Sequence, residues 1–121
     1  MSADLITSEQ IVAEMIRLSR RLDEDHDKLI EAARRYAVAE DRYRLEKAAA
    51  YLASSGTVDA RKAHVDQATS QSRRESHEAE GLKVAALERV RSTRAQLSAL
   101  QSVANAVKVE AELAGRYDRT G

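Results

Sequence analysis

The apolar positions in the first half of the chain recur at alternating steps of four and three residues. They form a seam through Ile11, Met15, Leu18, Leu22, Asp25, Leu29, Ala32, Tyr36, Ala39, Tyr43, Glu46 and Ala50. Only Asp25 and Glu46 interrupt the apolar or small pattern. A mean repeat of 3.5 residues keeps one stripe of a helix against a partner helix. The pattern predicts a helix over about residues 8–53, with Thr7 and Gln10 as the capping box at its start.

A short link is expected where the seam ends, at residues 54–57. Ser54 and Ser55 precede Gly56, which can take the left-handed conformation that ends a helix. Thr57 or Asp59 can cap the next helix. Because a link this short joins two long helices, it favours an antiparallel helical hairpin of the coiled-coil type.

A second helix is predicted over about residues 58–115, with a tail at 116–121. Its first part, residues 58–80, is polar and has small side chains at the inward positions, so it would gain little from packing. Gly81 is a candidate kink. From Leu82 the apolar pattern returns, and it continues through Leu97, Leu100 and Val107.

Self-assembly is expected because the seam offers only a narrow apolar surface for packing. The chain has no Phe or Trp, and its only aromatic residues are four tyrosines. A single all-α domain over residues 1–121 would therefore bury little as a monomer. The second helix also extends beyond the start of the first, which exposes apolar side chains. We expect a homo-oligomer held by the late helix through Leu97, Leu100, Val103 and Val107.

Composition narrows the classes of function. The chain has no cysteine and no proline, and its 20 basic residues balance 20 acidic ones. No apolar run approaches the roughly 20 residues that span a bilayer, and no secretory signal is evident. We expect a cytoplasmic protein without a membrane partner.

No catalytic, metal or cofactor site is predicted. The histidines are His26, His64 and His77, and no two have the helical spacing that a shared metal requires. The acidic residues of 23–27 are interpreted as a solvated face. No glycine-rich phosphate loop or nucleophile motif is present, so an enzyme is not expected.

Basic side chains near the link are the candidate nucleic-acid site. They are Arg42, Arg44, Lys47, Arg61 and Lys62, which a hairpin would bring to one end. Convergent basic groups can bind phosphates. The alternative is pairing with the neighbouring acids Glu40, Asp41, Glu46 and Asp59. Tyr51 has two interpretations as well, because it can stack on a nucleobase or pack over the turn.

Three stretches follow one another in an order that resembles a known group. They are YRLEKAAAYL (43–52), SSGTVDARKAHVD (54–66) and LSALQSVANAVKVEAELAG (97–115). Over roughly residues 36–114 the chain resembles a group of small all-helical tailed-phage proteins, which are similar in layout to recombination mediators of the UvsY type. The matching positions are Gly56, Thr57, Val58, Arg61, Lys62 and Ala63 in the link, and Leu97, Ala99, Leu100, Ser102, Ala104 and Glu110 in the late helix.

This resemblance implies an accessory protein of DNA recombination. Such mediators are oligomers that bind single-stranded DNA and help to load a recombinase. Neutral charge and few aromatic residues favour a different hypothesis, a protein–protein adaptor or assembly coiled coil without a role in nucleic-acid binding. A third hypothesis is a small phage inhibitor of a host protein that acts through the polar residues 58–80.

Overall fold

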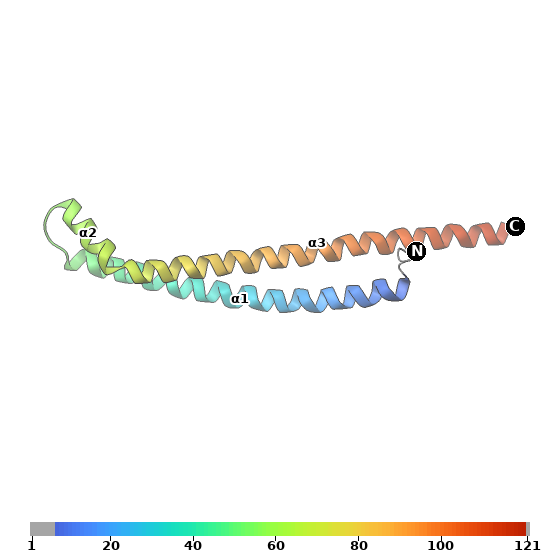
Figure 1. The fold of residues 1–121 in the computed structure, drawn as a ribbon, viewed down its shortest axis with the longest axis horizontal. Helices are drawn as coiled ribbons and strands as arrows, with labels where there is room; N and C mark the ends of the chain where they lie inside the picture. The colour runs from blue at the N-terminus through green and yellow to red at the C-terminus, as the bar shows by residue number, and fades with distance from the viewer. Residues whose placement is uncertain (1–6, 121) are drawn as a thin grey trace, which may run out of the picture. The chain divides into compact units, whose positions relative to one another are not determined.

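The part of the chain that the structure describes folds into three helices. The computed structural model describes the backbone of residues 7–120 and the side chains of residues 7–116. The helices are α1 (Ser8–Ala53), α2 (Val58–Ala68) and α3 (Ser70–Thr120), and the described residues include no strand (Figure 1). The all-α prediction is therefore confirmed.

The two ends of α1 have the local chemistry that the sequence predicts. At the start, the Thr7 N–H donates to Gln10 Oε1 at 2.8 Å, and the Gln10 N–H donates to Thr7 Oγ1 at 3.1 Å. This reciprocal pair is the predicted capping box. At the other end, Gly56 has a φ of +103°, which L-residues rarely adopt. The helix therefore stops at Ala53 and the chain turns.

Thr57 begins the next helix. Its hydroxyl accepts a hydrogen bond from the Ala60 N–H at 3.2 Å, so Thr57 rather than Asp59 caps α2. This bond satisfies one of the backbone donors that the first turn of a helix leaves without a partner.

The second helix differs from the prediction at two places. A single helix over 58–115 with a kink near Gly81 was expected, but the interruption lies at Thr69, and α3 is continuous through Gly81. The Thr69 hydroxyl donates to the Val65 carbonyl at 2.7 Å, and the Ser72 hydroxyl donates to the Thr69 carbonyl at 3.2 Å. Hydroxyl groups that bond to the backbone in this way bend helices, and here they separate α2 from α3.

The expected tail is also helical. Residues 116–120 belong to α3, and Gly121 lies outside the described residues. Gly115 does not end the helix. A glycine costs only about 1 kcal/mol relative to alanine inside a helix, and the chain has no proline to enforce a stop.

Packing divides the described residues into two compact units. One unit comprises residues 26–88, and the other comprises residues 7–25 together with 89–120. We call them the link unit and the terminal unit.

In the link unit, the second half of α1 lies beside the start of α3. The Ser76 hydroxyl bonds Glu40, and the Lys83 ammonium lies over the ring of Tyr36. Lys83 follows Ser76 along α3, whereas its partner Tyr36 precedes Glu40 along α1. The two segments therefore run antiparallel within this unit. The buried positions between residues 58 and 88 are Val65 and four small or polar residues: Thr69, Ser72, Ser76 and Ala79. As predicted, this contact buries little apolar surface.

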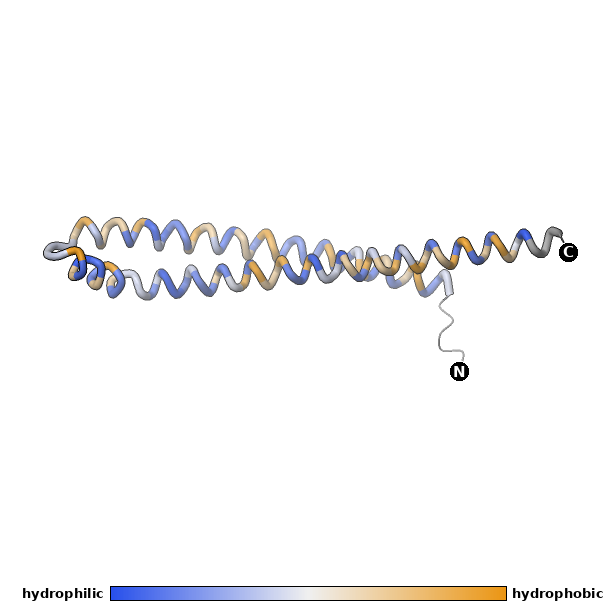
Figure 2. Tube along the Cα trace, turned by 90° about the horizontal axis from the view of Figure 1, so that it is seen from above, coloured by the Kyte–Doolittle hydropathy of each residue, from blue (hydrophilic) through white to orange (hydrophobic). Residues whose placement is uncertain are grey.

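In the terminal unit, Ile11 and Leu18 of α1 and Val90 of α3 are buried, together with Asp25 and Thr93. Farther along α3, Leu97, Leu100 and Val107 are half-buried, and Val103 is exposed. Figures 1 and 2 show the end of α3 extending past the start of α1. Val109 and Leu113, near this end, are exposed.

Candidate functional site

The five predicted nucleic-acid-binding residues all lie in the link unit. Arg42, Arg44 and Lys47 are on α1, whereas Arg61 and Lys62 are on α2. Four of them are exposed, and Arg61 is half-buried. Their environments differ, and these differences decide which of them can contact a ligand.

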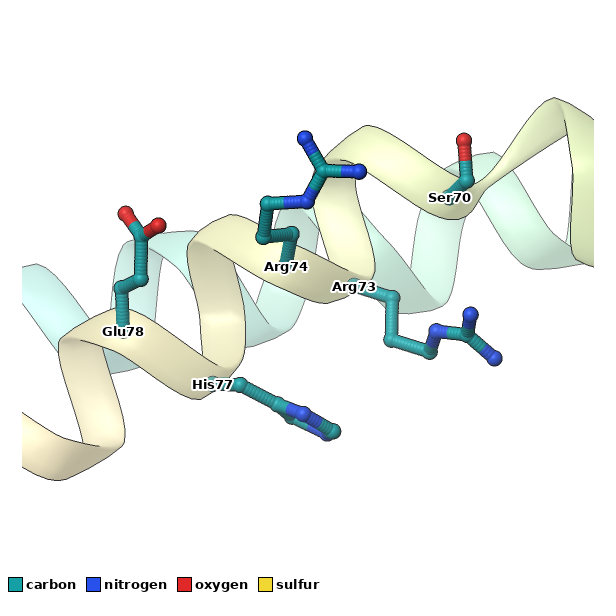
Figure 3. Close-up of a pocket in the computed structure, with 5 residues that line it drawn as sticks. All are labelled: Ser70, Arg73, Arg74, His77 and Glu78. Carbon is teal, nitrogen blue, oxygen red and sulfur yellow. The ribbon is translucent and has the colours of Figure 1, made fainter.

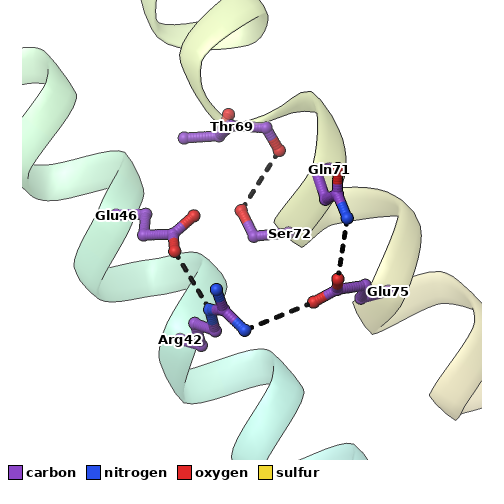
Figure 4. A network of polar contacts seen from close by, with 6 residues as sticks. All are labelled: Arg42, Glu46, Thr69, Gln71, Ser72 and Glu75. Carbon is purple, nitrogen blue, oxygen red and sulfur yellow. Dashed lines mark hydrogen bonds and ion pairs between the residues drawn. The ribbon is translucent and has the colours of Figure 1, made fainter.

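Arg42 is the centre of a polar network that connects α1 to α3 (Figure 4). Its Nε donates to Glu46 Oε1 at 3.1 Å, and its guanidinium lies 3.7 Å from a carboxylate oxygen of Glu75. Glu75 also accepts a hydrogen bond from the Gln71 amide at 3.2 Å. The Ser72 hydroxyl and the Arg42 guanidinium hold the pKa of Glu46 below its ordinary value, because both stabilise the carboxylate. Arg42 is thus already balanced by two carboxylates.

Arg44 and Lys47 also have neighbours within the chain. Arg44 Nε donates to Glu40 Oε1 at 3.1 Å, while the other Glu40 oxygen accepts from the Ser76 hydroxyl at 2.9 Å. Lys47 lies over the Tyr43 ring, 5.8 Å from its centroid. The pairing with Glu40 and Glu46 considered from sequence is therefore present for Arg44 and Arg42. Exposed pairs of this kind contribute only about 0–1 kcal/mol, so a stronger ligand can replace the carboxylate.

Arg61 has a structural position at the link. One of its guanidinium nitrogens donates to the Ser54 carbonyl at 3.3 Å, and its planar group lies 5.3 Å from the centroid of the Tyr51 ring. Its Nε is buried and has no hydrogen-bond partner among the described residues. Arg61 therefore ties α2 to the end of α1, and one face of Tyr51 is covered by this contact.

Sequence reasoning missed a second basic group on the first turns of α3. Arg73, Arg74 and His77 line a shallow, open hollow together with Ser70 and Glu78 (Figure 3). Within the described part of the chain, no ion pair involves Arg73, Arg74 or Lys62. Two adjacent arginines in an otherwise polar stretch were the signal available in the sequence.

The outer side of α1 in the link unit is apolar and exposed. The exposed fractions are 58% for Ile30, 65% for Val38, 72% for Leu45 and 85% for Leu52. Figure 2 shows apolar residues recurring along this helix. At 100° per residue these side chains point away from the seam. The inward-facing seam alone is enough to predict this helix. The second set of apolar residues, on the opposite side of the same helix, was therefore not recognised from the sequence.

None of the helices in residues 7–120 has an apolar stretch that is long enough to cross a membrane. The same described residues contain no group of three or more histidine and acidic side chains placed to hold a metal ion. No known protein family, curated protein or solved structure matches the chain.

Proposed function

We propose that this chain is a non-enzymatic helical accessory protein that works by assembling with other protein chains, its own copies first. The observation that carries the proposal is the exposed apolar side of α1, with Ile30, Val38, Leu45 and Leu52. Large apolar residues that recur along one side of a helix are typical of a protein-binding face. The half-buried Leu97, Leu100 and Val107 and the exposed Val103 of α3 offer a second place for self-association. The assembled form would be built from antiparallel helical hairpins.

We propose further that the assembly acts as a recombination mediator of the phage type, which binds single-stranded DNA and a recombinase. The resemblance of residues 36–114 to that group supports this function. Lys62, Arg73 and Arg74 would contact phosphates first, since they have no carboxylate partner among the described residues. Arg42, Arg44 and Lys47 are exposed, and the weak pairs of the two arginines can open toward a phosphate.

Assembly matters to this second proposal because the chain is neutral. A chain with no net charge has little attraction for DNA at long range. Several copies linked together would bind one strand at several places at once, which raises the overall affinity without any new contact. The host cytoplasm is the compartment in which a phage mediator would act.

The other function supported by a specific observation is that of a protein adaptor without nucleic-acid binding, including an inhibitor of a host protein. Arg42 and Arg44 are both engaged by carboxylates of the same chain. If the remaining basic groups bind no phosphate, the apolar face of α1 is the working surface by itself.

Fluorescence anisotropy of a labelled single-stranded oligonucleotide separates the two functions. The protein is titrated at low and high salt, and light scattering on the same sample gives its mass. A mediator should bind more weakly as salt rises, by about ten-fold or more if several phosphates are contacted. An adaptor should show the same assembled mass and no binding at either salt concentration.

A set of variants tests whether the proposed residues account for any DNA binding. Replacing Lys62, Arg73 and Arg74 with alanine should weaken binding and reduce its salt dependence. The control replaces Arg20, Arg21 and Lys28, which are exposed on α1, with alanine, so that net charge changes by the same amount. Equal losses in both sets would mean that binding depends on overall charge rather than on the basic groups of α2 and α3.

A further inference from the structure

The exposed side of α1 in the link unit carries six residues whose spacing reads the same from either end. We call them the outer stripe: Ile30, Arg34, Ala37, Val38, Asp41 and Leu45. The steps between them are four, three, one, three and four residues. At 100° per residue they fall within an arc of about 100° on one side of the helix. All six are exposed in the structure.

The chemistry of the stripe is self-complementary as well as its spacing. If a second copy of the helix lies antiparallel, with the symmetry axis between Ala37 and Val38, Ile30 faces Leu45 of the other copy. In the same arrangement Arg34 faces Asp41 of the other copy. Each of these contacts then occurs twice, which is the property of a two-fold symmetric interface.

The two charged residues determine the orientation. Arg34 and Asp41 form no ion pair within the described residues, although both lie in the middle of an apolar face. A parallel arrangement would bring Arg34 next to Arg34 and Asp41 next to Asp41, and like charges at an interface are unfavourable. The antiparallel arrangement pairs each arginine with an aspartate. Charged positions within a helical interface commonly fix the orientation of the partners in this way.

We infer that the outer stripe is a self-association surface on which a second copy of this chain docks antiparallel, with Arg34 of each copy paired to Asp41 of the other. This inference rests on the proposed self-assembly and names its surface. A second copy fits this stripe, because an antiparallel identical helix pairs each Arg34 with an Asp41 and places apolar side chains opposite apolar ones.

Charge reversal tests the pairing. Arg34→Asp and Asp41→Arg should each weaken the dimer by about ten-fold or more in sedimentation analysis, because each places like charges together. The double variant Arg34→Asp with Asp41→Arg should return the dissociation constant to near its original value. Arg20→Asp, on an exposed position of α1 outside the link unit, is the matched control. Circular dichroism checks that each variant keeps its helical content.

Cross-linking provides a second measurement that does not depend on charge. The chain has no cysteine, so Val38→Cys introduces a single thiol next to the symmetry axis. Oxidation should join two copies in high yield, whereas Val84→Cys, an exposed position on α3, should cross-link poorly.

The outcomes separate this inference from the function on which it rests. If neither single reversal changes the mass of the oligomer and the Val38→Cys variant does not cross-link, the chain assembles through another surface. The proposed function would then still stand. A protein that is monomeric at every concentration would contradict both. Loss of the dimer in the single variants without recovery in the double variant would rule out the antiparallel pairing.

Discussion

The hydroxyl of Thr93 on α3 donates a 2.7 Å hydrogen bond to a carboxylate oxygen of Asp25 on α1, and both residues are buried. They lie in the terminal unit beside an apolar set that includes Leu18 and Val90. A buried carboxylate is stable only when polar groups compensate for its lost hydration. Asp25, which was expected to lie on a solvated acidic face, is therefore a buried seam position matched by a hydroxyl directly opposite.

We predict that Thr93→Val destabilises the protein by about 1–3 kcal/mol, because Asp25 loses a hydrogen-bond donor while remaining buried. The double variant Thr93→Val with Asp25→Leu should recover most of this loss, since replacing both polar partners with apolar groups is close to neutral. Urea unfolding followed by circular dichroism measures both changes. If the single variant is as stable as the wild type, the hydrogen bond contributes nothing.

Arg61 offers a test of the link. Arg61→Ala should lower stability by about 1 kcal/mol, because it removes the contact with Tyr51 and the bond to the Ser54 carbonyl. Hydrogen exchange at residues 54–61 should become faster than in the wild type. Lys62→Ala is the control, since Lys62 is the exposed neighbour of Arg61. Equal exchange rates in the two variants would mean that Arg61 does not hold the link.

The pKa of Glu46 predicts a pH dependence. Because the folded chain lowers this pKa, the stabilising effect is fully present above the ordinary glutamate value of about 4.3 and is lost as the pH falls through the lower folded value. The melting temperature of the Glu46→Gln variant should therefore change less with pH in this acidic range than that of the wild type.

Glu14 is the matched comparison for Glu46. A hydrogen bond from Arg17 lowers the pKa of Glu14, which lies in the terminal unit. Glu14→Gln should remove a similar acidic dependence while leaving the Arg42 network unchanged. Melting curves from pH 7 downward, followed by circular dichroism, compare the two variants. A steeper pH dependence in Glu46→Gln than in the wild type would contradict the assignment.

Assembly through the late helix is tested at Leu97 and Leu100. Replacing both with aspartate should reduce the mass measured by light scattering, because these side chains are only half-buried within one chain. Gln101→Asp is the control on an exposed neighbouring position. An unchanged mass in the double variant would rule out this part of α3 as an assembly surface.

The features that were predictable from sequence are those fixed by local chemistry. The bounds of α1 follow from a seam that repeats many times, and the turn follows from the positive φ that Gly56 can adopt. The pairs Arg44–Glu40 and Arg42–Glu46 were also foreseeable, because residues four apart on a helix are always neighbours.

The features that were not predictable depend on a choice between close alternatives. A threonine hydroxyl can bond to water or to the helix backbone, and at Thr69 it bonds to the backbone and interrupts the helix. Arg42 reaches Glu75 only because of the register between α1 and α3, which the polar residues of 58–80 do not specify. Gly81 was the more obvious candidate for a kink, yet glycine permits a bend without requiring one.

The exposed apolar side of α1 belongs to a chain with a pI near 6.8. Near neutral pH, copies of this protein have almost no net charge to keep them apart. Unless the apolar side is covered, random collisions should lead to precipitation. We therefore expect solubility to pass through a minimum close to pH 7 and to rise when Leu45 or Leu52 is replaced with a charged residue.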